Sequence, residues 1–327
     1  MWALCSKMAG ADESLGLEVA QLTFYGEAIM AGWQPARLVL LGASALVVLS
    51  GCASLGTSPD APNRIPGWRS ELGKGTVSSY AEFAASGTPR ALGVAFSASA
   101  LDGLPTTGSD RHHCFDRNKD GVVDPATECL NHYEVVIPLP DAVARRADIP
   151  FTWVLLNWNP HGHMPPGVYD LPHFDVHFYM EPIANVFALQ DGPCGPEFIR
   201  CDQFEVARRP VASNHMHPDF KDVEAAAPAM GNHLVDLTSP EFKKQRFTRT
   251  WIFGVYDGKV TFYEEMVTRA FLLSKPSTCF PIKSPPAVGR SGFYPTLSCL
   301  RHDARTGEYT VSMETFVFRE AQAPAAK

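Results

Sequence analysis

The segment at residues 173–179 reads His-Phe-Asp-Val-His-Phe-Tyr and contains side chains that can bind a metal ion. Polar and apolar residues alternate along it, and this period of two is typical of a β-strand with one buried face. The other face therefore presents the imidazoles of His173 and His177 and the carboxylate of Asp175. Zinc, iron, copper and manganese all accept such ligands. The pattern predicts a site for a divalent transition metal, but it does not indicate a reaction.

The spacing of these three donors limits how they can share an ion. Alternate residues of a strand lie about 6.6 Å apart at Cα, so Asp175 can chelate an ion together with either neighbouring histidine. His173 and His177 would lie about 13 Å apart in an ideal strand, and we expect a bulge or bend if both bind one ion. The alternative is that both histidines form hydrogen bonds to carbonyl groups at the edge of the core.

Three residues elsewhere in the chain are candidates to complete the ligand set. His233 follows a glycine in Met-Gly-Asn-His, and glycine permits a close approach of the backbone. Glu264 shares a strand face with apolar residues, where an unpaired carboxylate is costly to bury, so it should bind the metal or pair with an arginine such as Arg269. Glu265, on the opposite face, is expected to be solvated. His163 lies in the loop before residue 173 and would be a fourth ligand or a group that orients the ligands.

A second kind of site is predicted at residues 116–124, which match the first nine positions of an EF-hand calcium loop. Side-chain oxygens fall at positions 1, 3, 5 and 9, with glycine at position 6 and a backbone carbonyl at position 7. Glu128 falls at position 13 instead of 12, and Pro125 disfavours an exiting helix. We expect either a structural calcium loop or a metal-free loop of Asx turns, with His112 and His113 on the surface beside it. The expected ligands are Asp116, Asn118, Asp120, Val122, Asp124 and Glu128.

Six of the eight cysteines fall into three pairs that are close in the sequence. An even number at such spacings, in an exported chain, predicts disulfides that staple loops. No Cys-x-x-Cys pair occurs, which disfavours the rival interpretation of a zinc site with cysteine ligands. The expected disulfides are Cys114–Cys129, Cys194–Cys201 and Cys279–Cys299.

The N-terminal region has the features of an exported lipoprotein. The apolar run at residues 38–49 is too short to span a bilayer and is typical of a signal peptide. Leu-Ser-Gly-Cys at its end resembles the bacterial lipobox, in which Cys52 is acylated and becomes the mature N-terminus. Acidic residues do not suit a basic leader, so we expect residues 1–29 to be a gene-model extension and residues 30–51 to be the signal peptide.

These features predict a location in the cell envelope. Ala53 stands where inner-membrane lipoproteins commonly have aspartate, so we expect an outer-membrane anchor facing the periplasm. The membrane is then a partner through the lipid, and residues 52–75 are expected to be a tether. A net charge of −7 and the lack of basic runs argue against nucleic acid as a partner. The identity of a small-molecule ligand and the formation of a homo-oligomer are left open.

The elements that position these residues are expected to be mainly β-strands. Apolar residues make up 45% of the chain, which allows a substantial core, and 27 prolines and 25 glycines favour long loops. Asp-Gly at 257–258 predicts a hairpin, and the few helical signals lie at 140–146 and 239–244. We expect one β-rich domain at 76–327, folded as a β-sandwich or cupin-like barrel with a loop inserted at 114–129. The expected strands are 92–97, 133–138, 151–156, 173–179, 250–256, 259–263 and 309–318.

The candidate ligands lie in segments that resemble an uncharacterised family of secreted bacterial proteins. Where that family usually has Glu-Pro-Met, Glu265 occupies the proline position, so the resemblance also selects Glu264 as the site residue. It covers about residues 130–275 and implies a β-rich fold and a shared site, without an assigned activity. The segments that carry it are Asn-Pro-His-Gly-His-Met-Pro-Pro-Gly-Val-Tyr (159–169), Pro-His-Phe-Asp-Val-His-Phe-Tyr (172–179), Met-Gly-Asn-His (230–233) and Phe-Tyr-Glu-Glu-Met (262–266).

Three classes of function agree with these observations. The first is a lipoprotein that binds a transition metal for structure, storage or ligand recognition. The second is a metalloenzyme of the oxygenase or hydrolase type, in which Tyr179 or Asp175 would transfer protons beside an open coordination position. The third is a metal-free interaction module with long proline-rich loops. The known nucleophile, phosphate-binding and zincin motifs do not occur, so whether the chain is an enzyme is left open.

Overall fold

The computed structural model describes residues 63–325 of the chain. The predicted N-terminal extension, signal peptide and lipidated Cys52 lie outside the described residues. Within residues 63–325, no helix is both long and apolar enough to cross a membrane.

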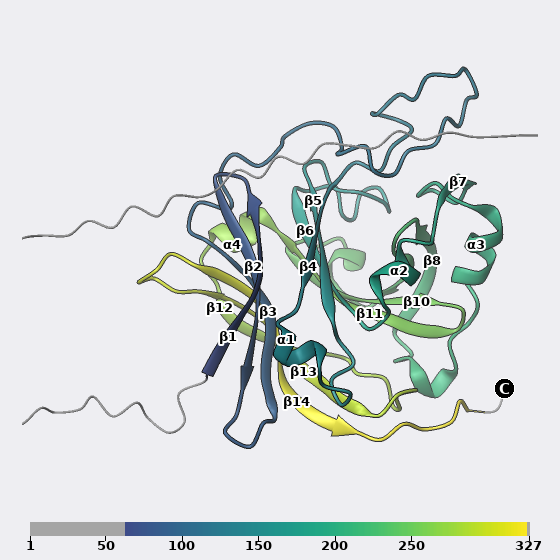
Figure 1. Cartoon of the computed structure of the whole chain (residues 1–327). Coiled ribbons are helices and arrows are strands. Elements are labelled where there is room, and N and C mark those ends of the chain that lie inside the picture. Colours follow the sequence, from purple (N-terminus) through teal and green to yellow (C-terminus); the bar gives the residue numbers. More distant parts are fainter. Residues whose placement is uncertain (1–62, 326–327) are drawn as a thin grey trace, which may run out of the picture. The chain divides into compact units, whose positions relative to one another are not determined.

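Two antiparallel β-sheets form the folded unit, as Figure 1 shows. The six-stranded sheet has the order β1 (Asn63–Leu72), β2 (Gly75–Phe83), β3 (Pro89–Phe96), β14 (Tyr309–Arg319), β13 (Gly292–His302) and β12 (Ser277–Pro281). The seven-stranded sheet has the order β4 (Tyr133–Pro138), β5 (Trp153–Asn159), β6 (His173–Tyr179), β11 (Lys259–Thr268), β10 (Arg249–Tyr256), β9 (Gly231–Asp236) and β8 (Phe220–Ala227). The prediction of a mainly β fold is confirmed, and its form is a sandwich of two sheets instead of a cupin-like barrel.

One short strand and several short helices lie in the connections between the sheet strands. β7 (Asp191–Cys194) lies outside both sheets. The helices are α1 (Asp141–Ala144), α2 (Ile183–Val186), α3 (Cys201–Ala207), α4 (Arg269–Leu273) and the 3-10 helices η1 (Ser213–His215) and η2 (Pro240–Lys243). The helical signals at 140–146 and 239–244 therefore correspond to α1 and η2, while α2, α3 and α4 were not anticipated from the sequence.

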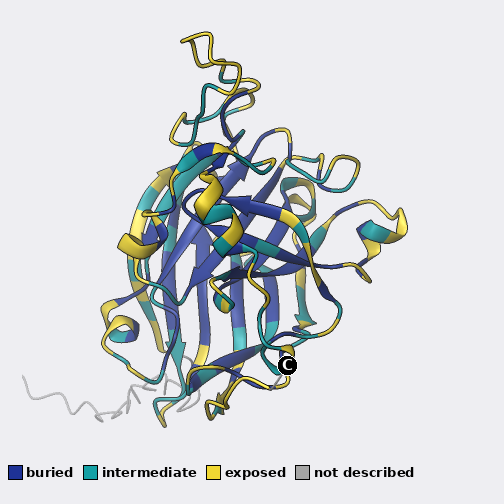
Figure 2. Cartoon of the chain, turned by 90° about the vertical axis from the view of Figure 1, so that its right-hand side faces the viewer, coloured by how far each residue is buried: buried dark blue, intermediate teal, exposed yellow. Residues whose placement is uncertain are grey.

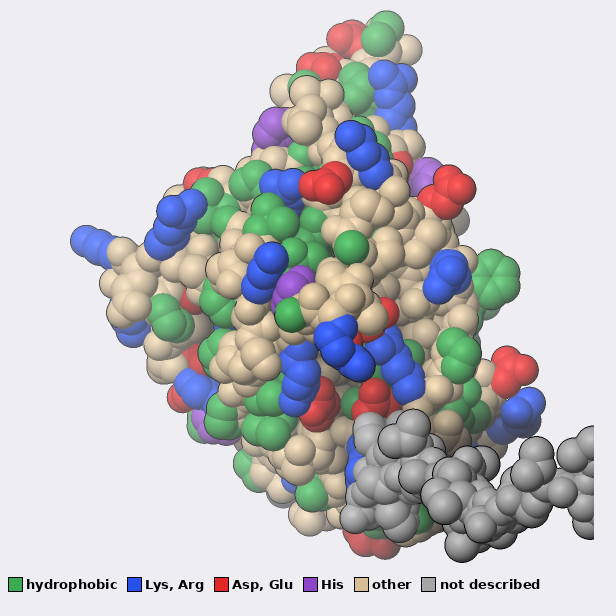
Figure 3. Space-filling view, turned by 90° about the vertical axis from the view of Figure 1, so that its left-hand side faces the viewer, with side chains coloured by type: hydrophobic (Ala, Val, Ile, Leu, Met, Phe, Trp, Pro, Cys, Tyr) green, Lys and Arg blue, Asp and Glu red, His purple; other side chains and the backbone are tan. Residues whose placement is uncertain are grey.

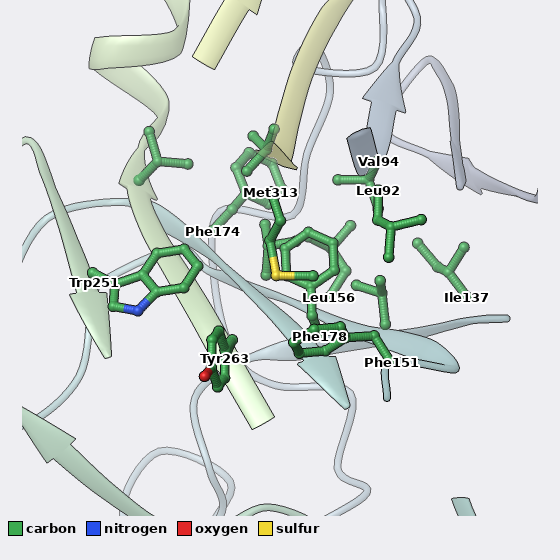
Figure 4. Packing of buried hydrophobic residues seen from close by; sticks show 14 of the residues in the cluster. Leu92, Val94, Ile137, Phe151, Leu156, Phe174, Phe178, Trp251, Tyr263 and Met313 are labelled. Atoms are coloured by element: carbon green, nitrogen blue, oxygen red, sulfur yellow. The ribbon is translucent and has the colours of Figure 1, made fainter. Parts of the chain in front are cut away.

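The main core lies between the two sheets, where aromatic and aliphatic side chains interdigitate (Figure 4). Phe96 of β3 packs against Phe174 of β6 with ring centroids 5.2 Å apart, which joins the two sheets directly. Burying one such side chain contributes on the order of 1.5–3 kcal/mol to folding. Because side chains alternate along a strand, the apolar residues of β6 point into this core and its polar residues point to the outer face of the seven-stranded sheet.

That outer face is covered by loops and short helices. Figure 2 shows that most strand residues are buried, while the exposed residues gather in the connecting segments. Trp153, Tyr179 and Phe262 of the sheet pack against Val186 and Phe198 of the covering segments. Every residue of β6 is consequently buried, so the expectation of a strand with one buried face is wrong. The polar side chains of β6 lie in an interior, where each one needs a partner.

Several predicted boundaries differ from the structure. Residues 63–72, expected to belong to the tether, form β1 and pair with β2, so the folded unit begins before residue 76. β11 continues to Thr268, beyond the expected end at residue 263, because its further residues pair with β6. All three predicted disulfides form.

On the face drawn in Figure 3, basic and acidic side chains are interspersed and no extended basic surface is visible.

Candidate metal centre

The six predicted transition-metal ligands lie on the outer face of the seven-stranded sheet and form two groups. Within each group, one ligand atom from each residue lies within 4.8 Å of the others. We name the groups the Asp175 triad (His163, His173 and Asp175) and the Glu264 triad (His177, His233 and Glu264). β6 pairs regularly with β5 and β11 over its whole length, so no bulge brings His173 and His177 together. The bulge or bend that both histidines would need to bind one ion therefore does not occur in β6.

The Glu264 triad spans three strands. Glu264 of β11 stands opposite His177 of β6, and its Oε1 lies 3.5 Å from His177 Nε2. His233 of β9 approaches from the other side, with Nε2 3.9 Å from Oε2 of Glu264. The Glu264 side chain is 1% exposed, and its Oε2 has no hydrogen-bond partner among residues 63–325. Arg269, the alternative partner, lies elsewhere and donates to the carbonyl of Leu101.

One aromatic ring holds the two histidines of this triad in place. The ring centroid of Phe262 lies 5.0 Å from that of His177 and 5.2 Å from that of His233. The ring covers Gly254 of β10, where a Cβ atom would lie 1.9 Å from a carbon of Phe262. Glycine at this position therefore leaves room for the Phe262 ring, which contacts the two imidazoles edge-on, at interplanar angles of 81° and 63°.

The Asp175 triad combines a strand with a loop that folds back onto it. His173 Nε2 lies 3.1 Å from Oδ1 of Asp175, and His163 Nε2 lies 3.3 Å from Oδ2. Oδ2 also accepts a hydrogen bond of 2.7 Å from Asn159. The loop can place His163 here because Gly162 has a φ of +77°, and a Cβ atom there would lie 2.0 Å from the carbonyl oxygen of Tyr169.

All four histidines are anchored in the same way. The Nδ1 atom of each lies 2.6–3.0 Å from a backbone carbonyl oxygen. A carbonyl oxygen only accepts hydrogen bonds, so each Nδ1 carries a proton and donates it, and Nε2 is the atom left for a second proton or a metal. Such backbone anchoring is how proteins orient metal-binding histidines. The carbonyls belong to Met164, Leu171, Leu155 and Ala225.

The distances between nitrogen and carboxylate oxygen suit two ligands of one ion. Ligand atoms placed about 2.0–2.1 Å from a tetrahedral zinc lie about 3.3–3.4 Å from each other. The corresponding distances in the triads are 3.1, 3.3, 3.5 and 3.9 Å. His173 Nε2 and Asp175 Oδ1 lack the alignment of a hydrogen bond in spite of their proximity. Both triads therefore have ligand atoms at a spacing that could hold a metal ion.

The two triads differ in their charge when no metal is bound. Burial raises the pKa of Glu264 well above its usual range, and the negative charges of Asp175 and Glu265 add to this effect. Burial also lowers the pKa of His177 to about 4 and that of His233 to about 3. At neutral pH the two imidazoles of the Glu264 triad are therefore uncharged, and its carboxyl group is held towards the neutral acid.

The Asp175 triad instead keeps an ion pair. Burial by itself would raise the pKa of Asp175, but the imidazoles of His173 and His163 hold it well below its usual range. Burial likewise opposes the charged form of His163, yet the carboxylate of Asp175 raises its pKa to about 9. At neutral pH a proton on His163 thus occupies the place that a metal would take.

A cavity of about 60 Å³ lies beside both triads. His163 and Asp175 of one triad and His233 of the other contribute to its wall, together with Tyr169 and Glu197. Tyr169 is 1% exposed, and its hydroxyl group has no hydrogen-bond partner in the described part of the chain. Burial raises the pKa of Glu197. Neither residue was predicted as a site residue from the sequence, although Tyr169 ends the block that contains His163.

Tyr179 is not placed to transfer protons at this site. Its ring stacks on Trp153 with centroids 4.2 Å apart, and its hydroxyl group donates to the carbonyl of Ala229 at 3.4 Å. It belongs to the apolar cluster below α2, and the cavity is lined by Tyr169 instead. Glu265 is also not solvated as expected, because it is buried between the sheets and pairs with Arg249.

A third cluster of titratable groups surrounds Glu134 of β4. His113 lies between Glu134 and Asp191, with Nδ1 2.9 Å from Asp191 Oδ1 and Nε2 3.3 Å from Glu134 Oε2. Although burial opposes its charged form, hydrogen bonds to these carboxylates raise the pKa of His113 to about 9. His113 is therefore an ion-pair partner with only 10% of its side chain exposed, in contrast to the expected surface position, while the side chain of His112 is 62% exposed.

The loop predicted to bind calcium is closed by Cys114–Cys129 and folded on its own side chains. The carboxylate of Asp116 accepts the N–H of Gly121 at 2.9 Å. Asn118, Asp120 and Asp124 each accept the N–H two residues further on, which are Asx turns. Glu128 is buried and accepts N–H groups of residues 117, 118 and 124. Both alternatives for this loop contain such turns, so calcium binding stays a prediction.

No family model, curated protein or solved structure matches the chain.

Proposed function

We propose that this chain is a cell-envelope lipoprotein that binds a divalent transition metal (zinc, iron, copper or manganese) at the Glu264 triad. One observation carries the proposal. The Glu264 carboxyl group, which is 1% exposed and whose Oε2 has no partner among residues 63–325, faces the Nε2 atoms of two histidines, each anchored through Nδ1 to a backbone carbonyl. A metal ion would satisfy all three ligand atoms at once. The Asp175 triad is then a second position, where the metal competes with the proton on His163.

The location and the calcium loop are further parts of the proposal. The lipobox ending at Cys52 supports a lipid anchor in the outer membrane with the domain in the periplasm. Three disulfides are consistent with an oxidising compartment. The oxygen-rich turns between residues 116 and 128 support a structural calcium ion inside the first disulfide loop.

Metal analysis by mass spectrometry of the purified protein, after incubation with each metal and removal of the excess, tests the proposal. We expect about one equivalent of a transition metal that is lost in Glu264→Gln and His177→Ala, because each change removes one ligand. His302→Ala, which removes a histidine of β13 outside both triads, should keep the metal. Calcium should be unaffected in all variants. No transition metal in the wild type, or an unchanged amount in Glu264→Gln, would contradict the proposal.

The cavity favours a metalloenzyme as the second candidate function. Three protein ligands leave a coordination position of the metal free for water or substrate, and the metal would act there as a Lewis acid. The cavity of about 60 Å³ beside the triads has room for a ligand of about three or four heavy atoms, at about 10–15 Å³ for each water-sized group. The Tyr169 hydroxyl group, which has no partner among the described residues, would donate a hydrogen bond to that ligand.

Azide binding to the cobalt(II) form distinguishes an open site from a closed one. An open site should change its visible absorption spectrum on addition of azide, and Tyr169→Phe should weaken azide binding. A spectrum that azide does not alter would indicate a closed site, and it would favour metal binding for structure or storage.

A further inference from the structure

A second cavity, of about 720 Å³, lies on the other side of β11 from the metal centre. Neighbouring residues of β11 separate the two sites, because Glu264 points to the outer face and Tyr263 points between the sheets. The second cavity lies near the β10–β11 hairpin, between the seven-stranded sheet and β13. Its volume falls within the range of about 300–1,000 Å³ that is usual for small-molecule sites. Apolar side chains form much of its wall, among them Met180, Val211, Val260, Val288 and Tyr294.

A buried polar group faces this cavity without a partner. Tyr263 is 2% exposed and lines the cavity. Among residues 63–325, no hydrogen bond is formed by its hydroxyl group, whereas Tyr294 on the facing sheet donates to the carbonyl of Arg290 at 2.8 Å. Figure 4 shows the Tyr263 hydroxyl group directed away from the packed apolar side chains. The Tyr263 hydroxyl group is reached from the cavity, so a molecule bound there can accept its hydrogen bond.

The rim of the cavity carries basic side chains. Lys259 and Arg290 are exposed and line the cavity, and neither forms an ion pair within the described residues. Asp257 also lies at the rim, but it pairs with Arg209 at 2.6 Å. Glu181 is the remaining acidic residue there. Two unpaired cations against one carboxylate favour an anionic group at the mouth of the cavity.

The C-terminal segment closes one side of the cavity. In Figure 1 the chain continues from β14 along the lower edge of the view to the C-terminus. Hydrogen bonds fasten this segment to the cavity wall: His215 Nε2 donates to the carbonyl of Gln322 at 2.9 Å, and Gln322 N–H donates to the carbonyl of Val288 at 2.9 Å. The cavity is therefore bounded by the two sheets and by this fastened segment.

We propose that this cavity binds an amphipathic anion of the fatty-acid class. The apolar chain lies between the sheets against Val260 and Val288, and the carboxylate lies at the rim beside Lys259 and Arg290. The hydroxyl group of Tyr263 donates a hydrogen bond to an oxygen of the bound molecule or to a water held by it. This function is separate from metal binding, because the two sites lie on opposite faces of β11.

Titration of the purified protein with cis-parinaric acid, a fluorescent fatty acid, tests the proposal. Palmitate should displace the probe. Val260→Trp, which fills the cavity, should weaken probe binding by at least about tenfold. Lys259→Glu should weaken it by about fivefold, because a positive charge at the mouth of the cavity is replaced by a negative one. Lys221→Glu, an exposed change in β8 outside the cavity wall, should bind like the wild type. Glu264→Gln should also bind like the wild type, which separates this site from the metal centre.

Each possible result either supports the fatty-acid site or contradicts it. Lys259 is exposed, so Lys259→Glu gives an answer even if Val260→Trp does not fold, and circular dichroism shows whether each variant is folded. Absence of probe binding to the wild type, or wild-type binding by folded Val260→Trp, would overturn the cavity as a fatty-acid site. Hexadecanol should displace the probe less well than palmitate. Equal displacement by both, unchanged in Lys259→Glu, would overturn the assignment of an anionic head group.

Discussion

The Asp175 and Glu264 triads contain the same ligand types, two histidines and one carboxylate, and lie on the same sheet face. At neutral pH the Asp175 triad nevertheless contains an ion pair, whereas the Glu264 triad is held towards its uncharged form. Asp175 accepts a hydrogen bond from Asn159 and stays ionised beside a protonated His163. Burial raises the pKa of Glu264, and the negative charges of Asp175 and Glu265 add to this effect, while its Oε2 has no hydrogen-bond partner among residues 63–325. Hydrogen-bond donors and neighbouring charges, more than the ligand types, therefore decide which groups of a buried cluster are charged when no metal is bound.

Replacing the carboxyl group of each triad by a neutral amide should give the largest difference between the triads in the free energy of unfolding. In the metal-free protein, Asp175→Asn removes the counter-ion of the protonated His163, of whose side chain 30% is exposed, so we expect a loss of about 2–3 kcal/mol in the free energy of unfolding. Glu264→Gln replaces a carboxyl group held towards its neutral form by an amide of similar shape, and we expect a change within about 1 kcal/mol. Urea unfolding measures both. Equal losses in the two variants would show that the triads do not differ in charge.

With zinc bound, Glu264 should contribute more to the free energy of unfolding than Asp175 does. At a free zinc concentration of about 100 times Kd, the wild type should gain about 2.7 kcal/mol in the free energy of unfolding. Glu264→Gln should lose most of this gain because it lacks a ligand of the tighter site, while Asp175→Asn should retain it. Urea midpoints with and without zinc give the values. If Asp175→Asn loses the gain and Glu264→Gln keeps it, the primary site is the Asp175 triad.

In the metal-free protein, the pH dependence of the free energy of unfolding should distinguish His163, whose pKa is raised, from His177, whose pKa is lowered. The pKa of His163 is raised to about 9, so its contribution is fully present below about pH 6.5 and is lost as the pH rises towards 9. The pKa of His177 is lowered to about 4, so stability is lost as the pH falls from about 6.5 towards 4, where only the unfolded state takes up the proton.

We expect each effect to be about 1–3 kcal/mol, with the smaller value for His163 because 30% of its side chain is exposed. The measurement is the difference in unfolding free energy between the wild type and His163→Gln, and between the wild type and His177→Gln, across pH 4–9. A difference that does not change with pH in either window would contradict the assigned protonation states.

The two buried tyrosines near the site should show the smallest effect. Tyr169→Phe removes a hydroxyl group that has no partner among the described residues, so we expect no loss of stability or a gain of about 0.5 kcal/mol. Tyr179→Phe removes the hydrogen bond to Ala229 and should cost about 1 kcal/mol. Thermal unfolding of the metal-free variants compares them. A larger loss in Tyr169→Phe would mean that its hydroxyl group is satisfied in the folded protein.

Local patterns were enough to find the residues of the candidate site. The alternation along 173–179 placed His173, Asp175 and His177 on one strand face, and the apolar neighbours of Glu264 showed that its carboxylate would be buried. The three disulfides followed from cysteine spacing in the same way. These inferences succeed because the period of a strand and the cost of burying charge act over a few residues.

Other features depend on contacts between distant segments. β1 has no strong local signal, and it becomes a strand by pairing with β2. Tyr169 and Glu197 reach the cavity because their loops fold over the sheet, and no local pattern specifies that path. The cavity next to Tyr263 is likewise formed by segments from several parts of the chain, including the C-terminal one.

The sequence by itself thus determined which side chains face the outer surface of the seven-stranded sheet and that they must be paired. Only the tertiary structure decided how they are paired, because the register of β6 against β11 sets His177 opposite Glu264. The fold of the loop at 160–172 brings His163 to Asp175 instead. The side-chain period is a property of one strand, whereas register and loop path are set by packing between segments far apart in the chain.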